Sequence, residues 1–303
     1  MSSSLPDEFN VRYGNADDLR AVTELLIAEE ETLRGSSQWR DVDTRDWFHG
    51  LEGSGGLWIA ERGADLVGVL GLFFGPVTRG WFDLDPTCDR DRIGSALAEL
   101  AEQRAREHGS AMLKLSAFAE NRPVIGLLER AGFQPDRRYH RMEIALNERP
   151  SEPVWPEGIS CTTFDGANPR AVYDAVNDAF SDDYAHHPLP FDEWKRMRLE
   201  APDFDPSLWF VAREGCEIAG ICRCTEQRWS CGWVDALGVR KPWRRRGLGS
   251  ALLRHAFRML HERGQKRVGL GVDAENPSGA TRLYERAGMH VVSEIISFEK
   301  RLI

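Results

Sequence analysis

The second half of this 303-residue chain repeats the first half, and this duplication constrains the fold more than any other feature of the sequence. Matching stretches at an offset of roughly 150 residues indicate one structural unit that is used twice. The matches are LWIAERGADLVGVLGLFF from Leu57 with LWFVAREGCEIAGICRCT from Leu208, GSAL at Gly94 with GSAL at Gly249, and LLERAGF at Leu127 with LYERAGM at Leu283.

Each copy predicts the same order of elements: an amphipathic helix, two hairpin-like strands, a third strand, a helix opened by glycine, a strand, a short helix and a final strand. In the second copy, Asn168 is expected to cap a helix that Pro169 opens. Asn15 is expected to cap the corresponding helix of the first copy. Apolar residues alternate over 268–272, as in a strand. This order predicts an α/β fold with a mixed sheet in each copy.

The boundary between the copies is expected in the stretch NERPSEPVWPEG, from Asn147 to Gly158, which is rich in proline and charge and has no apolar periodicity. We therefore predict an N-terminal domain over 1–148, a linker over 149–157 and a C-terminal domain over 158–303.

The composition favours a soluble protein that acts on small molecules. With 42% hydrophobic residues the chain can build two ordinary cores. A formal net charge of −9 argues against a nucleic-acid partner, because phosphate binding needs clustered cations. No stretch of about 18 apolar residues and no basic, apolar leader is present, so we expect a cytoplasmic protein with no membrane partner, as a monomer or a homodimer.

Six cysteines give no sign of a metal site, because they form no CxxC pair and lack the histidine spacing of structural zinc. Reduced thiols in the core or on the sheet are the expected state, with a metal or redox role as the alternative. Cys222 and Cys224 are expected on one face of a strand. The cysteines are Cys88, Cys161, Cys216, Cys222, Cys224 and Cys231.

The strongest chemical signal is a glycine loop between a strand and a helix. A predicted strand over 233–239 runs into KPW and then RRRGLGSALL, which starts at Arg244 and continues as a helix. Unpaired N–H groups at a helix start bind anions, and glycines let a diphosphate approach the backbone. The dinucleotide and triphosphate patterns GxGxxG and GxxxxGK are absent.

These residues resemble the GNAT superfamily of N-acetyltransferases, whose signature R/Q-x-x-G-x-G/A follows a strand that ends in valine. Arg244, Gly247 and Gly249 occupy the signature positions, and ENPSGATRLYERAGM, from Glu275, resembles the second block of the family. The duplication is similar to that of mycothiol synthase and related paired-domain acetyltransferases. The resemblance implies two tandem domains, each with a mixed, mostly antiparallel, splayed sheet flanked by helices, and acetyl-CoA as co-substrate with no metal.

The resemblance also implies where the donor binds. Backbone groups of Leu237 and Val239 would pair with the pantetheine arm, and Gly238 would suit a bulge that splays the strand; a weakly packed strand glycine is the alternative. Tyr284 would hydrogen-bond the leaving sulfur. The donor residues implied are Leu237, Gly238, Val239, Arg244, Arg245, Arg246, Gly247, Leu248, Gly249, Ser250, Asn276 and Tyr284.

An amine acceptor needs a base, because an amine with a pKa of about 10.4 is almost wholly protonated near neutral pH. Asp235 is the first candidate, expected on the strand face of Leu237 and Val239, where some relatives carry a glutamate. Glu226 on the preceding strand is the second candidate. Other relatives carry their glutamate where this chain has Trp233, so the choice stays open. The Val239 amide is the expected donor to the developing oxyanion.

The first copy is expected to be a structural half that binds no donor. Asp89 and Asp91 stand where the second copy has arginines, and Arg92 stands where it has Gly247. Reversing charges next to a diphosphate removes its electrostatic stabilisation. Leu128 replaces the tyrosine. We therefore expect about one acetyl-CoA site per chain.

The acceptor is the least defined partner in the sequence. Tyr184, His186 and His187 lie on a segment that tends to cover the acceptor site in this family, although ordinary loop histidines are the alternative. The sequence favours transfer of acetyl to the primary amine of a small molecule. A non-catalytic acyl-CoA sensor and an acetyltransferase of protein or peptide amines are the alternatives.

Overall fold

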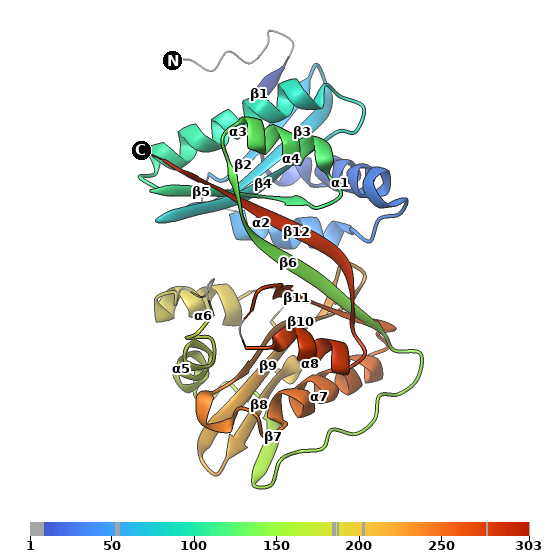
Figure 1. Cartoon of the computed structure of the whole chain (residues 1–303), viewed down its shortest axis with the longest axis vertical. Helices are drawn as coiled ribbons and strands as arrows, with labels where there is room; N and C mark the ends of the chain where they lie inside the picture. The colour runs from blue at the N-terminus through green and yellow to red at the C-terminus, as the bar shows by residue number, and fades with distance from the viewer. Residues whose placement is uncertain are drawn as a thin grey trace. The chain divides into compact units, whose positions relative to one another are not determined.

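A computed structural model describes residues 9–51, 55–183, 186, 188–201, 204–276 and 278–302. The chain forms two compact units (Figure 1). Unit 1 contains residues 1–139 and 293–303, and unit 2 contains residues 140–292.

Unit 1 is built on a sheet with the strand order β1-β2-β3-β4-β5-β12. Its elements are β1 (Asn10–Tyr13), the 3-10 helix η1 (Ala16–Asp18), α1 (Leu19–Arg34), α2 (Asp41–Leu51), β2 (Leu57–Arg62), β3 (Asp65–Phe73), β4 (Val77–Leu84), α3 (Arg90–Glu107), β5 (Met112–Phe118), α4 (Arg122–Arg130), the first half of β6 (Gln134–Ala145) and most of β12 (His290–Arg301).

Unit 2 repeats this arrangement with the strand order β6-β11-β10-β9-β8-β7. Its elements are the second half of β6, β7 (Ile159–Thr163), α5 (Pro169–Ala179), α6 (Phe191–Leu199), the 3-10 helix η2 (Pro206–Leu208), β8 (Trp209–Glu214), β9 (Glu217–Arg228), β10 (Cys231–Val239), the 3-10 helix η3 (Lys241–Trp243), α7 (Leu248–Glu262), β11 (Arg267–Asp273) and α8 (Ala280–Arg286).

Each sheet mixes antiparallel hairpins with one parallel pair. β4 pairs with β5 and β10 pairs with β11 in parallel, while the ladders β1–β2–β3–β4 and β7–β8–β9–β10 are antiparallel. The predicted α/β class with a mixed sheet in each of two tandem copies is therefore confirmed.

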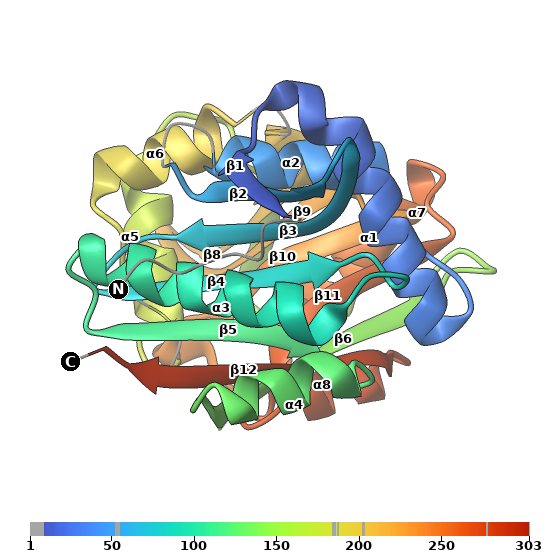
Figure 2. The same ribbon diagram turned by 90° about the horizontal axis from the view of Figure 1, so that it is seen from above.

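Helices cover both faces of each sheet. In unit 2, α5 and α6 pack on one face through Val172, Ala175 and Trp194, and α7 and α8 lie on the other (Figure 1). In unit 1, α1 and α2 contribute Val22 and Trp47 to one core, and α3 and α4 cover the opposite face (Figure 2). The glycine loop over 244–250 thus follows a strand that is covered on both faces.

The helix caps expected from the sequence are present. The Asn168 side chain accepts a hydrogen bond from the Ala171 N–H at 3.0 Å, and Pro169 is the first residue of α5. Asn15 caps the 3-10 helix η1, which leads directly into α1: it accepts from the Asp17 N–H at 2.8 Å and completes a capping box with Asp18, and α1 itself has no side-chain cap. These local signals fix where the first helix of each repeat begins.

The last strand of the chain belongs to the sheet of unit 1. Residues Ile295 to Arg301 of β12 pair antiparallel with β5, in the register Ile295–Phe118 to Arg301–Met112. The strand at the same place in the first repeat, β6, lies beside β11 in unit 2. The division into 1–148 and 158–303 follows the sequence repeat and stays a prediction, whereas the compact units take their last strands from the other repeat.

Candidate functional site

The parallel pair in unit 2 opens along its length. The β10–β11 ladder consists of Gly232–Val268, Trp233–Gly269 and Val234–Leu270, while β10 continues beside β9 as far as Val239. The Arg240 N–H donates to the Ala219 carbonyl of β9. Because N–H groups alternate in direction along an antiparallel strand, the Val239 N–H points to the opposite side, toward the gap beside β11.

The register of β10 with β9 shifts twice, between Cys231 and Trp233 and at Asp235, which corrects the expectation of a bulge at Gly238. The register with β9 shifts between Val234 and Ala236, and Gly238 pairs regularly with Ile221. Gly238 is needed for another reason: a Cβ there would lie 2.9 Å from the Ala179 Cβ and 3.0 Å from the Phe180 ring. The glycine therefore lets the end of α5 rest directly on β10.

This bulge also moves Asp235 away from the strand face on which it was expected. Leu237 and Val239 pack with the core cluster that includes α7. Asp235 instead bonds Thr225, whose neighbour Cys224 belongs to that same cluster, so Thr225 and Asp235 lie on the other face of the sheet.

The start of α7 offers free backbone donors. Gly247 is its N-cap with φ 86°, and no side chain caps it. The first intrahelical bond runs from the Ala251 N–H to the Gly247 carbonyl, which leaves the N–H groups of Leu248, Gly249 and Ser250 for another acceptor. A Cβ on Gly247 would meet no atom within 4 Å, so the space in front of the helix is open.

The arginines of the loop have different partners. Arg244 turns inward: it donates to the Val239 carbonyl at 3.0 Å and the Ala179 carbonyl at 2.9 Å. Arg246 pairs with Glu214 at 2.6 Å. Arg245 has φ 61° and forms no ion pair with any residue that the structure describes. Of the three side chains, Arg245 is thus available to an anion without loss of an ion pair.

Tyr284 belongs to α8, and Asn276 lies between the end of β11 and the start of α8. Tyr284 is 7% exposed and packs with Cys222, and none of the described residues hydrogen-bonds its phenol. Burial, with smaller contributions from Cys222 and Asp183, raises the pKa of the phenol above its ordinary value. The Asn276 side chain donates to Asp183 at 3.1 Å.

The two carboxylates predicted as bases lie in different places. Asp235 accepts from Thr225 at 2.5 Å and from Arg228 at 2.9 Å, and its side chain is 10% exposed. Glu226 is 53% exposed and pairs with Arg263 at 3.1 Å, just after the C-terminal end of α7. Asp235 thus stands where β10 leaves β11. Glu226 lies near the C-terminal end of α7, whereas the glycine loop precedes the N-terminal end of that helix.

Of the residues predicted to contact the acceptor, Tyr184 and His187 lie outside the described residues. The His186 ring nitrogen Nε2 lies 3.0 Å from the Asn177 amide oxygen, and the ring packs against Phe180. Sequence reasoning missed two aspartates. Asp182 pairs with Lys241 and Arg244, and Asp183 accepts a hydrogen bond from Asn276. Their signal was an acidic pair directly before the segment expected to cover the acceptor.

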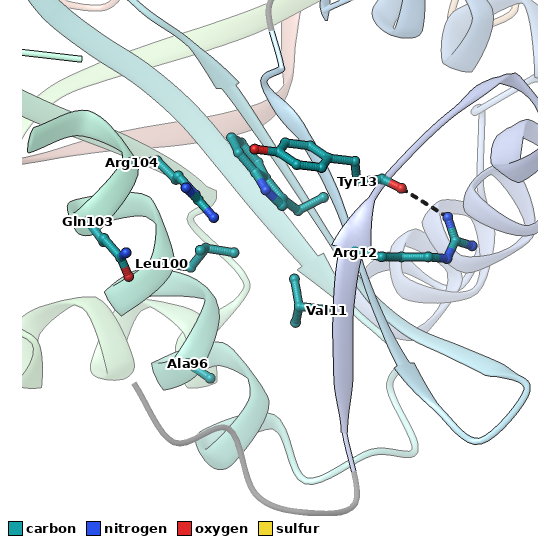
Figure 3. Close-up of a pocket in the computed structure, with 8 residues that line it drawn as sticks. Val11, Arg12, Tyr13, Ala96, Leu100, Gln103 and Arg104 are labelled. Atoms are coloured by element: carbon teal, nitrogen blue, oxygen red, sulfur yellow. Dashed lines mark hydrogen bonds between the residues drawn. The ribbon is translucent and has the colours of Figure 1, made fainter. Parts of the chain in front are cut away.

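A cavity of about 230 Å³ lies elsewhere, in unit 1 between β1, β2 and α3 (Figure 3). Leu100, Gln103 and Arg104 line it from the second half of α3, away from the start of that helix. In unit 2 the counterpart of Leu100 is His255, and Trp155 packs on it with ring centroids 5.6 Å apart. The cavity includes none of the residues predicted for the donor or acceptor.

The described cysteines are all free, and the Cys222 and Cys224 sulfurs lie 3.8 Å apart on one face of β9, as predicted. Within the described ranges, no three His, Cys, Asp or Glu side chains come close enough together to hold a metal ion. None of the described helices has both the length and the hydrophobicity of a membrane-spanning segment.

Comparison with known proteins finds the same family in both repeats. A sequence model of the acetyltransferase (GNAT) family matches residues 19–133 and again residues 170–289. A curated protein named mycothiol acetyltransferase, from Streptomyces scabiei, is 30% identical over 222 residues, which cover 66% of this chain and 70% of that protein. Four curated relatives of this name are matched over 61% to 70% of their own length.

Solved structures share the whole architecture. The GCN5-related N-acetyltransferase from Sphaerobacter thermophilus has a TM-score of 0.86 and 30% identity, and the match covers 99% of this chain and 97% of that one. A tandem GNAT protein from the clavulanic acid biosynthesis pathway has a TM-score of 0.75 over 98% of both chains. At 17% identity this second likeness shows the fold alone.

Proposed function

Since the chain belongs to the acetyltransferase (GNAT) family and is an N-acetyltransferase, we propose that unit 2 transfers the acetyl group of acetyl-CoA to the primary amine of a small molecule. The observation that carries the proposal is the combination of a parted β10–β11 pair with an uncapped helix start at its open end. A slot for an extended arm and a cradle for its diphosphate are what this donor needs.

The residues present fit the donor. Leu237, Gly238 and Val239 form the edge that the pantetheine arm would follow, with the Val239 N–H directed into the gap. The N–H groups from Arg245 to Ser250 would hold the diphosphate, whereas the Arg244 N–H, also expected there, already donates to the Lys241 carbonyl. The Arg245 side chain would add charge. Asn276 and Tyr284 would border the arm on the other side.

Acetyl-CoA would supply the acetyl group as a thioester. The Val239 N–H would donate to the thioester oxygen as negative charge develops there. The Tyr284 phenol would donate to the sulfur, because its raised pKa keeps it protonated. We keep Asp235 as the first candidate for the group that takes the amine proton, directly or through water, because it stands where the two strands part. Glu226 is the weaker candidate, since it lies at the opposite end of α7.

The acceptor class follows from the relatives. Curated proteins that match this chain carry the name mycothiol acetyltransferase, so an acceptor related to mycothiol is the first to test. A panel of small amines that includes the amine precursor of mycothiol should release coenzyme A with at least one member. Release with peptides alone would favour the protein acceptor, and binding without turnover on any amine would favour a sensor.

The donor site is tested by charge at Gly247. Gly247→Asp should weaken acetyl-CoA binding at least about tenfold in calorimetry, because a carboxylate would face the diphosphate. Gly247→Asn is the matched control, since it brings the same size and the same strain at φ 86° without the charge. Wild type should bind about one donor per chain. Equal affinities of the Asp and Asn variants would contradict the cradle.

A further inference from the structure

Both units place an acidic side chain beside the end of the strand that precedes the helix with the GSAL sequence. In unit 1 this is Glu29 of α1, which contacts Leu84 at the end of β4. In unit 2 it is Asp182, beyond the end of α5, which contacts Lys241 and Arg244 after β10. The two acids lie in similar places but are not counterparts in the duplication, because alignment of the starts of α1 and α5 pairs Glu29 with Ala179.

In unit 1, Glu29 occupies the position that corresponds to the gap between β10 and β11 in unit 2. Glu29 is 2% exposed and accepts from the Leu84 N–H at 3.0 Å and the Asn121 side chain at 2.9 Å. Leu84 ends β4 as Val239 ends β10, and Asn121 corresponds to Asn276. The backbone donor that faces the gap in unit 2 is thus bound by a carboxylate in unit 1.

The helix start of unit 1 is closed in the same way. The Asp89 carboxylate accepts from the Arg92 N–H at 3.2 Å and caps α3, whereas α7 has no side-chain cap. Arg90 pairs with Glu29 at 3.2 Å. In unit 1, Glu29 and Asp89 therefore accept hydrogen bonds from the backbone N–H groups that a bound anion would otherwise occupy.

In unit 2, Asp182 is held by exposed ion pairs. Asp182 pairs with Lys241 at 2.8 Å and with Arg244 at 2.8 Å, with about half of its side chain exposed. The two cations lower the pKa of Asp182, so it carries its charge at neutral pH. Exposed ion pairs of this kind are weak and readily exchange partners.

We propose that Asp182 competes with the diphosphate of the donor for Lys241 and Arg244, and so sets the affinity of this site for acyl-CoA. The inference rests on the proposed function and adds the residue that limits donor binding. In unit 1, Glu29 binds the amide at the strand end itself. Asp182 is exchangeable, because it reaches the cations of the loop and leaves the Val239 amide and the α7 start unoccupied.

Asp182→Asn tests this competition. The variant should bind acetyl-CoA more tightly than wild type in calorimetry, by up to about fivefold, because two cations lose their internal partner. The gain should shrink as salt rises, since the competition is between charges. Asp174→Asn is the matched control: it removes an equal charge from α5, where Asp174 pairs with no described residue other than Arg170, four residues earlier.

The outcomes separate this inference from the proposed function. Tighter binding by Asp182→Asn, with unchanged binding by Asp174→Asn, supports the competition. Unchanged or weaker binding by Asp182→Asn, while wild type binds acetyl-CoA, overturns it and makes Asp182 a support for Arg244. A wild-type protein that binds no acetyl-CoA overturns the proposed function and this inference together.

Discussion

Asp235 combines a suitable position with hydrogen bonds that hold its side chain in place. It occupies the bulge at which β10 leaves β11, and both of its oxygens accept hydrogen bonds, from Thr225 and Arg228. A base in this setting is needed only while the acceptor amine is protonated.

Asp235→Asn should therefore lower kcat about a hundredfold or more at pH 7, which is the usual contribution of a general base. The loss should shrink as the pH approaches about 10, where a typical amine supplies its own free base. Initial rates between pH 7 and pH 10 measure this, with Glu226→Gln as the comparison. A constant loss across the range would make Asp235 a structural residue, and no loss would exclude it.

At the scale of single residues, the sequence predicted which elements carry the candidate side chains better than the faces on which they lie. Gly247 is the N-cap of α7, Arg244 contacts the end of β10, and Tyr284 is buried in the core of unit 2, while their role in donor binding stays a prediction. The face of Asp235 was wrong, because the extra residue of the bulge depends on pairing with β9 and leaves no mark in the alternation of β10 itself. The partner of Arg244 could not be foreseen either, since Asp182 lies 62 positions away in the chain.

Elements were predictable where a local signal sets their ends. Asn168 with Pro169 gave the start of α5, and alternation gave β11 with Val268 and Leu270 buried. β1 and β7 escaped notice because strands of four and five residues carry too little pattern. They exist because the edges of the β2 and β8 hairpins pair with them.

The contact of α5 with β10 gives a prediction at this scale. Gly238→Ala places a methyl group 2.9 Å from Ala179 and 3.0 Å from Phe180, so the end of α5 must move. The free energy of unfolding should fall by about 1–3 kcal/mol, as in other overpacked sites. Urea denaturation measures this. Gly271→Ala in β11 is the control, because its added carbon meets no atom within 4 Å. If both variants lose the same free energy of unfolding, the end of α5 moves aside without a cost in stability.

At the scale of the whole molecule, the sequence predicted the duplication but not the exchange of the final strands β6 and β12 between the two repeats. β6 and β12 follow the same AGF or AGM sequence in their repeats and have similar lengths. Either strand could complete either sheet, so local pattern cannot choose between them. The choice is made by burial: Ile296 and Phe298 of β12 enter the core formed with β5, α3 and α4 of unit 1.

This exchange predicts that a substitution late in the second repeat destabilises the first. Phe298 is 1% exposed in the core of unit 1, so Phe298→Ala should cost about 3–5 kcal/mol of unfolding free energy. Amide hydrogen exchange should then rise in β5, which pairs with this part of β12, and stay low in β11. Val291→Ala, in the same strand at 44% exposure, should change little. Faster exchange in β11 instead of β5 would place the final strand in its own repeat, because a strand protects the neighbour with which it shares hydrogen bonds.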